Sequence, residues 1–254
     1  MTRAVLYDST RCIGCKACEE GCSKRWGLPY NDAIAKEEQL SEHKLTAVRT
    51  IGDRYARKLC MHCNDPACAS VCPVAALQKT AAGPVVYHEE RCMGCRYCMT
   101  ACPHQVPVYT WNARFPVVRK CDLCSDRAAT NGPTRCTEAC PVEATVTGDR
   151  DALLAEAQKR IKEKPGDYYP KVYGVQEGGG TSVLILAGVP FGDLGYRADL
   201  PNGPLPGLTW EVLQHIPDIA MSGGILLGGI YWLTSRREAV AAAEGGPSRG
   251  KKVR

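Results

Sequence analysis

The cysteines of this chain constrain its fold more than any other feature. There are 16 of them in 254 residues, and all lie between positions 12 and 140. High cysteine content is typical of small secreted domains held by disulfides, but this chain is too long for that class. The cysteines also fall into four tight groups of four, which disulfide frameworks rarely do. The groups are Cys12, Cys15, Cys18 and Cys22; Cys60, Cys63, Cys68 and Cys72; Cys92, Cys95, Cys98 and Cys102; and Cys121, Cys124, Cys136 and Cys140.

The spacing inside each group is typical of ligands to a cubane iron–sulfur cluster. The first and third groups follow C-x2-C-x2-C-x3-C, whereas the second widens one gap to four residues and the fourth to eleven. Three closely spaced thiolates wrap one cluster, and a fourth, followed by proline, reaches the other cluster of a pair. Three groups end in Cys-Pro, and the first ends in Cys22-Ser23. The spacing therefore predicts iron–sulfur clusters.

Structural zinc is the alternative to iron–sulfur for such cysteines. Zinc sites combine two separated Cys pairs, whereas the first and third groups each place three cysteines on one short loop. An interaction module held together by structural zinc is therefore the less favoured interpretation, and a colourless purified protein would support it.

An internal repeat supports the same interpretation. Residues 5–18 align with residues 85–98, and residues 72–76 align with residues 140–144. Each unit reads as a short strand, a ligand loop and a short helix that carries the fourth cysteine. This is the half-unit of a bacterial ferredoxin, and the chain contains four of them.

In number, order and spacing the four groups resemble those of the four-cluster iron–sulfur (β) subunits of the molybdopterin oxidoreductase superfamily. The resemblance covers residues 1 to about 150 and implies four [4Fe–4S] clusters, because no ligand position lacks a cysteine. It also implies that the first group pairs with the fourth and the second with the third. The implied ligands are Cys12, Cys15, Cys18 and Cys140 for cluster 1; Cys60, Cys63, Cys68 and Cys102 for cluster 2; Cys92, Cys95, Cys98 and Cys72 for cluster 3; and Cys121, Cys124, Cys136 and Cys22 for cluster 4.

Cationic residues adjoin the ligands in sequence. Positive charge near a cluster raises its reduction potential because the added electron is stabilised, and solvation of the loop surface is the alternative role. His62 and His104 also adjoin ligands, but we expect them to pack rather than to bind iron. The cations are Arg11, Lys16, Arg91, Arg96, Arg119 and Lys120.

The second half of the chain predicts a membrane anchor. Residues 149–164 read as one amphipathic helix, and residues 166–210 are rich in glycine and proline around one β-like run. Residues 219–235 carry no charge, and at ~1.5 Å per residue they span about 25 Å, the short limit for crossing a bilayer. Tyr231 and Trp232 lie near one end of this stretch, as in an aromatic belt. A buried core helix is the alternative.

The charges around this stretch predict its orientation. The residues before it carry no Lys or Arg for some twenty positions, so the positive-inside rule places the tail in the cytoplasm and the cluster domain on the outer, periplasmic face. The first residues show no apolar signal and no twin arginine, so we expect export with a signal-bearing partner. The basic residues after the stretch are Arg236, Arg237, Arg249, Lys251, Lys252 and Arg254.

The predicted fold class is α+β, with two interleaved bacterial-type (2[4Fe–4S]) ferredoxin modules. We expect the four-cluster double-ferredoxin domain in residues 1–150 and a helix plus an extended partner-contact segment in residues 151–218. A single-pass transmembrane helix is expected in residues 219–235, followed by a basic cytoplasmic tail in residues 236–254. The single C-terminal helix resembles the respiratory formate dehydrogenase and uptake hydrogenase branch.

The expected function is electron transfer, with no catalytic residues in this chain. We expect a catalytic partner, either a molybdopterin formate dehydrogenase subunit, placed first, or a [NiFe] uptake hydrogenase subunit, and a membrane partner such as a cytochrome b or another quinone-reactive subunit. A soluble cytoplasmic ferredoxin-like carrier is the alternative of another class. The net charge of +5 is spread along the chain, so a nucleic-acid partner has no support.

Overall fold

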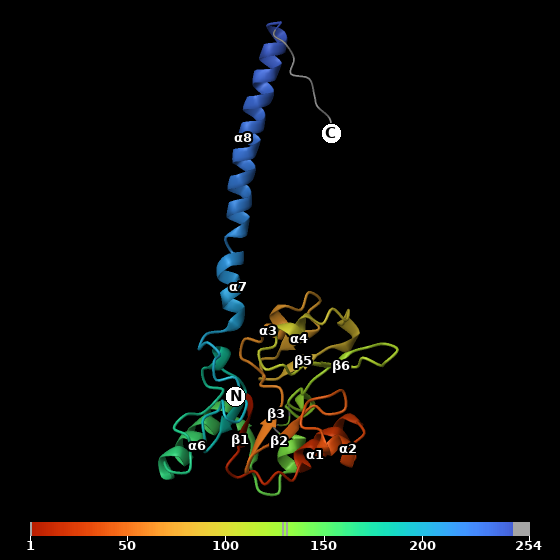
Figure 1. The fold of residues 1–254 in the computed structure, drawn as a ribbon, viewed down its shortest axis with the longest axis vertical. Coiled ribbons are helices and arrows are strands. Elements are labelled where there is room, and N and C mark those ends of the chain that lie inside the picture. The colour runs from red at the N-terminus through yellow and green to blue at the C-terminus, as the bar shows by residue number, and fades with distance from the viewer. Residues whose placement is uncertain (1, 129, 131, 246–254) are drawn as a thin grey trace. The chain divides into compact units, whose positions relative to one another are not determined.

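The computed structural model describes residues 2–128, 130 and 132–245. The chain divides into two units, Met1–Pro206 and Gly207–Arg254. The first unit mixes short helices and short strands (Figure 1), as the α+β prediction requires.

A three-stranded sheet organises the first unit, in the order β8-β1-β9. Strand β1 (Arg3–Asp8) pairs antiparallel with β8 (Thr145–Asp149), in the register Tyr7↔Thr145. It pairs in parallel with β9 (Val183–Leu186), in the register Val5↔Val183. All six residues of β1 are buried, so the N-terminal strand becomes the centre of a sheet whose other strands come from the second half of the chain.

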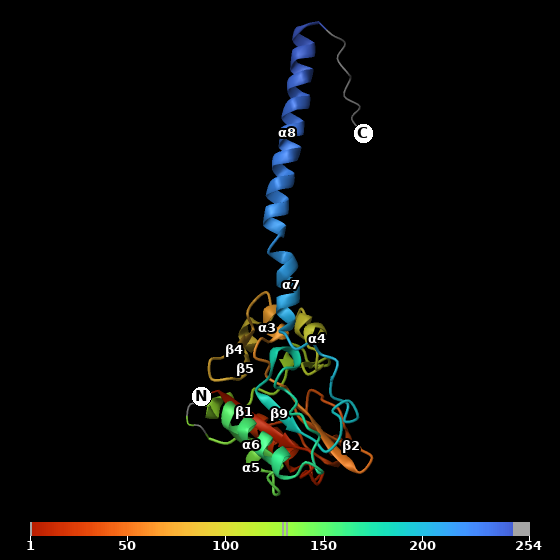
Figure 2. The same cartoon turned by 90° about the vertical axis from the view of Figure 1, so that its left-hand side faces the viewer.

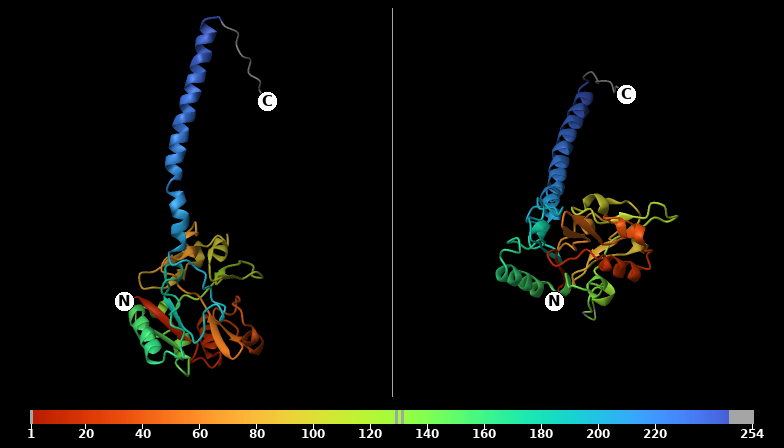
Figure 3. Two further views of the ribbon diagram at one scale, coloured as in Figure 1. Left: turned by 60° about the vertical axis from the view of Figure 1, so that its left-hand side comes forward. Right: turned by 60° about the horizontal axis from the view of Figure 1, so that its bottom comes forward.

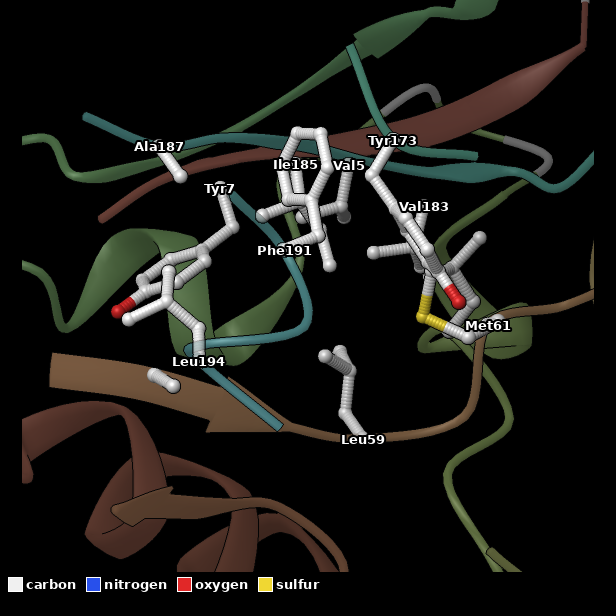
Figure 4. Close-up of a cluster of buried hydrophobic side chains, with 12 residues drawn as sticks. Val5, Tyr7, Leu59, Met61, Tyr173, Val183, Ile185, Ala187, Phe191 and Leu194 are labelled. Carbon is white, nitrogen blue, oxygen red and sulfur yellow. The ribbon is translucent and has the colours of Figure 1, made fainter. Parts of the chain in front are cut away.

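The alternating side chains of this sheet pack on two apolar cores, because successive residues of a strand point to opposite faces. On one face, Val5 and Ile185 pack with Phe191 and Leu194. Figure 4 shows these side chains directed toward the segment that carries Leu59 and Met61.

The other face of the sheet is covered by α6 (Arg150–Glu163), which contributes Leu153 and Ala157 to the second core. Figure 2 shows α6 lying across β1 and β9. The predicted helix at 149–164 is thus confirmed. The glycine-rich segment after it, which we expected to be an extended partner-contact segment, supplies β9 and much of the first core.

Three hairpins complete the strands of the first unit. Strands β2 (Ala47–Ile51) and β3 (Arg54–Lys58) pair directly before the second cysteine group. The other hairpins flank the third group and share one apolar core with Cys68 and Cys98. They are β4 (Leu77–Lys79) with β5 (Val85–Tyr87), and β6 (Val108–Tyr109) with β7 (Val118–Arg119).

Five short helices lie near the cysteine groups. Helices α1 and α2 lie on one side of the first unit (Figures 1 and 3), and the Nζ of Lys16 donates to Ala35 O at 2.6 Å between them. The α-helices are α1 (Ala17–Trp26), α2 (Asp32–Lys36), α3 (Ala67–Ser70), α4 (Tyr97–Ala101) and α5 (Arg135–Glu138), and the 3-10 turns are η1 (Glu89–Arg91), η2 (Ser125–Arg127) and η3 (Glu177–Gly179).

Helices α7 (Leu205–Leu213) and α8 (Ile216–Ala243) form the end of the described chain. At 28 residues α8 is about 42 Å long, and it includes a stretch long and apolar enough to cross a membrane. The helix continues past residue 235 because charged residues and alanines do not end a helix. The predicted basic residues Arg249, Lys251, Lys252 and Arg254 lie outside the described residues.

Candidate iron–sulfur centres

All four ligand loops make the same backbone turn. The residue before the second cysteine of each group has a positive φ, a conformation that glycine adopts at no cost and other residues do not. Two groups use glycine there, as the repeat suggested, and the other two make the turn without it. The angles are +70° at Gly14, +51° at His62, +73° at Gly94 and +58° at Leu123.

The two glycine loops are pressed against aromatic rings. A Cβ added at Gly14 would lie 2.2 Å from the ring of Tyr55, and one at Gly94 would lie 3.0 Å from the hydroxyl of Tyr109. The turn therefore favours glycine without requiring it, and it is the close approach of a side chain that leaves no room for a Cβ at Gly14 and little at Gly94.

The cysteines followed by proline share a second turn. The third residue after each has a positive φ, at Ala75, Gln105 and Glu143. Proline cannot continue a helix, and α3, α4 and α5 end before these cysteines. Cys22 is followed by serine instead, and α1 runs on through it to Trp26. The fourth ligand of the first group is thus placed on a helix.

The structure brings the groups together in pairs. Helix α1 of the first group packs on α5 of the fourth, and α3 of the second packs on α4 of the third. The first contact is close, because a Cβ on Gly21 would lie 3.0 Å from that of Ala139. Arg25 on α1 also donates to both carboxylate oxygens of Asp122 in the fourth group, at 2.8 and 2.7 Å.

Four cysteines that we assign to one cluster line a single cavity. They are Cys22, Cys121, Cys124 and Cys136, the predicted ligands of cluster 4, and apolar groups make up most of the remaining wall. Burial, followed by the neighbouring Cys136 and Cys124, raises the pKa of the Cys22 thiol to about 12. Iron offsets this cost by binding the thiolate. The cavity and its donors therefore fit a thiolate-bound cluster.

Thiols of clusters 2 and 3 lie within electrostatic reach of the other members of their sets. Burial, then Cys60 and Cys102, raises the pKa of Cys63 to about 12. Burial, then Cys92, Cys95 and Cys72, raises the pKa of Cys98 to about 11.

In the first group, burial raises the pKa of Cys18 to about 12, and both Cys136 and Cys12 contribute to the rise. Cys12 belongs to the same predicted set, whereas Cys136 belongs to cluster 4. Cys140 is placed beside α1 by the contact between α5 and that helix.

No three His, Cys, Asp or Glu side chains among the described residues converge on a point that could hold one metal ion. A cubane spreads its four thiolates over four separate irons, whereas structural zinc requires four ligands around one ion. None of the cysteines forms a disulfide in this part of the chain.

Several N–H and O–H groups point at the cysteine sulfurs. The backbone N–H of Ala76 donates to Cys72 Sγ at 3.2 Å, and that of Arg135 donates to Cys124 Sγ at 3.4 Å. The Thr134 hydroxyl lies 3.1 Å from Cys136 Sγ. Such hydrogen bonds stabilise negative charge on sulfur and contribute to the potential of a cluster.

One of the predicted cations is buried among the ligands. The Nζ of Lys120 donates to Cys121 O at 2.8 Å and lies 4.0 Å from Cys60 Sγ, so it contacts both the fourth and the second group. Three others, Arg11, Arg91 and Arg96, are exposed, which favours the solvation interpretation for them.

Sequence reasoning missed the buried cation Arg57, which lies among the cysteines of the fourth group. It is 1% exposed and donates to the hydroxyls of Thr46 at 2.9 Å and Thr145 at 3.0 Å. Arg57 lies in strand β3, outside every cysteine motif, so the sequence gave no indication that it is buried. We expected His62 to pack rather than to bind iron. His62 is fully buried, and its Nδ1 accepts the Val85 N–H at 2.9 Å.

Comparisons with known proteins identify the class of cofactor and the family. Residues 53–150 match the model of a 4Fe-4S dicluster domain. A protein of Nitratidesulfovibrio vulgaris is 38% identical over 94% of this chain and 69% of its own length. The hydrogenase-2 operon protein HybA of Escherichia coli O157:H7 is 39% identical over 83% of this chain and 77% of its own. The iron–sulfur subunit of formate dehydrogenase-O of Escherichia coli K12 is 32% identical over 78% and 68%.

Proposed function

This chain belongs to the family that includes the hydrogenase-2 operon protein HybA and the iron–sulfur subunits of formate dehydrogenases, and we propose that it relays electrons through four [4Fe–4S] clusters. It is an electron-transfer subunit of an oxidoreductase complex and binds [4Fe–4S] clusters. The proposal concerns the number of clusters, their ligands, the path between them and the partners at each end.

Each cluster takes three cysteines from one group and one from its partner group, within two interleaved ferredoxin modules in residues 1–150. Support comes from the contacts of α1 with α5 and of α3 with α4, and from the cavity that four cysteines line. The ligand sets are Cys12, Cys15, Cys18 and Cys140; Cys60, Cys63, Cys68 and Cys102; Cys92, Cys95, Cys98 and Cys72; and Cys121, Cys124, Cys136 and Cys22.

The path runs in the order cluster 1, cluster 4, cluster 2, cluster 3. The observation that carries this order is the position of Lys120, whose Nζ contacts the backbone of Cys121 and lies 4.0 Å from Cys60 Sγ. Clusters 4 and 2 therefore meet at the junction of the two modules. The loops at the ends are exposed, with Ile13 at 55% beside cluster 1 and Met93 at 65% beside cluster 3. Exposed ends allow electrons to enter and leave.

Two catalytic partners are candidates. The first candidate, expected from the sequence, is a molybdenum or tungsten formate dehydrogenase. A [NiFe] hydrogenase is the second candidate, and the higher identity to HybA, 39% against 32% for the formate dehydrogenase-O subunit, specifically favours it. Metal analysis of the co-purified complex separates them, because molybdenum or tungsten identifies the first and nickel the second.

The membrane end of the path is a quinone-reactive subunit, held next to this chain in the bilayer by residues 219–235. Exposed apolar side chains on α8, including Ile225 and Leu227, support an apolar environment for the helix. Arg236 and Arg237 follow this stretch and Asp218 precedes it, which favours a cytoplasmic tail and a cluster domain on the outer face. Residues 151–218 contribute the partner-contact segment.

Truncation tests this function. A chain cut before Asp218 should give a complex that leaves the membrane, still reduces artificial dyes and no longer reduces quinone. If the intact complex is extracted without detergent, the chain is a soluble carrier and the membrane proposal is wrong.

A further inference from the structure

The Arg57 guanidinium is buried without a carboxylate partner. Two other cations near the first and fourth groups do have one, since Arg25 pairs with Asp122 at 2.7 Å and Lys44 with Glu19 at 2.8 Å. Arg57 forms no ion pair with a carboxylate in the described part of the chain, and its side chain donates hydrogen bonds to the neutral hydroxyls of Thr46 and Thr145 and to Cys136. A buried charge without a counter-charge costs several kcal/mol.

The groups that surround this charge are cysteines. Arg57 lines the cavity formed by the four ligands of cluster 4. Burial raises the pKa of Cys136, but Arg57 and the Thr134 hydroxyl outweigh it and the pKa is lowered. The guanidinium thus lies against the ligand set proposed for cluster 4.

The side chain is held in this position from several directions. The backbone N–H and C=O of Arg57 both hydrogen-bond the hydroxyl of Tyr196, each at 3.0 Å. Thr46 precedes β2 and Thr145 begins β8, so the two side-chain hydrogen bonds come from separate elements. Arginine suits such a site because it stays charged when buried and its planar donors are fixed by hydrogen bonds.

We propose that Arg57 is the counter-charge of cluster 4, and that it raises the reduction potential of that cluster. The inference rests on the proposed function, because it requires cluster 4 to be present. Four thiolates give a cubane a net negative charge, and reduction adds one more electron. A fixed positive charge in a poorly screened interior therefore stabilises the reduced form more than the oxidised form.

The experiment is a redox titration followed by EPR on the complex, purified anaerobically, with wild-type Arg57, Arg57→Gln and Arg57→Lys. Iron is counted in each sample. Lys159→Gln is the control for net charge, because Lys159 lies on α6 in an exposed pair with Glu163. We expect one of the four midpoint potentials, that of cluster 4, to become more negative in Arg57→Gln, with a smaller shift in Arg57→Lys and none in Lys159→Gln.

The outcomes separate this inference from the proposed function. A wild-type count near eight irons contradicts the four-cluster proposal, whereas a full count with unchanged or uniformly shifted midpoints in Arg57→Gln overturns the role of Arg57. If Arg57→Gln does not load its iron, Thr46→Asp neutralises the guanidinium in place and must lower the same midpoint. If neither variant binds its full complement of iron, the iron content of Arg57→Lys decides. A full complement supports the role of Arg57 as a counter-charge. An incomplete one shows that the site requires the shape of the guanidinium rather than its positive charge.

Discussion

Arg25 on α1 forms a two-bond ion pair with Asp122, which lies between the first two cysteines of the fourth group. Both side chains are 13% exposed. The pair joins the helix that carries Cys18 and Cys22 to the loop that carries Cys121 and Cys124. The first and fourth groups are thus held together by a contact that needs no iron.

Replacing Arg25 should loosen cluster 4 selectively. In Arg25→Ala the Asp122 carboxylate keeps only its local hydrogen bonds, and we expect a loss of about 2 kcal/mol, as for a hydrogen-bonded charge that is partly buried. Iron release to a chelator should become faster for about a quarter of the iron. Lys24→Ala, which removes a surface pair with Glu20 on the same helix, is the control. Equal release from both variants would contradict the prediction.

The Gly14 turn should tolerate no side chain. In Gly14→Ala the new Cβ meets the ring of Tyr55, which adds about 1–3 kcal/mol of overpacking to about 1–2 kcal/mol for the positive φ. Gly52→Ala is a matched control, because Gly52 has φ +61° and nothing within 4 Å. Thermal loss of cluster absorbance should occur at a clearly lower temperature in Gly14→Ala than in Gly52→Ala. Equal temperatures would show that Tyr55 moves aside freely.

If the fourth cysteine of each group binds the cluster of its partner group, substitutions of two cysteines in the same group should affect different clusters. Cys72→Ser should perturb the EPR signal of cluster 3 and largely spare that of cluster 2, because Cys72 is assigned to the set of Cys92, Cys95 and Cys98. Cys68→Ser should perturb cluster 2 instead. Loss of the same signal in both variants would mean that each group binds its own cluster.

The orientation of α8 can be tested in spheroplasts. Protease added from outside should digest or release the cluster domain, while a tag placed at Arg254 stays protected by the membrane. A digested tag with a protected cluster domain would reverse the proposed topology.

The sequence predicts local chemistry better than long-range pairing. The spacing of Cys12, Cys15 and Cys18 fixes a short ligand loop, because few turns can present three thiolates so closely. The apolar run around Val183 indicates a strand, but its partner β1 lies more than 170 positions earlier, and no local pattern specifies that pairing.

Other features depend on tertiary contacts. Leu123 and His62 take a glycine-like φ although their residue types disfavour it, because the surrounding packing determines the turn. Arg57 reads as an ordinary strand residue until the structure places it between two groups of cysteines. The role of such residues follows from burial, which a single sequence does not specify.

The number of clusters is the central claim, and iron and acid-labile sulfide measured together on the anaerobically purified complex test it most directly. Four cubanes on sixteen cysteines require about sixteen iron and about sixteen sulfide per chain, after correction for the iron of the catalytic and membrane subunits. We expect both counts to reach this value. A count near eight of each would leave half of the proposed path without clusters and would contradict the account.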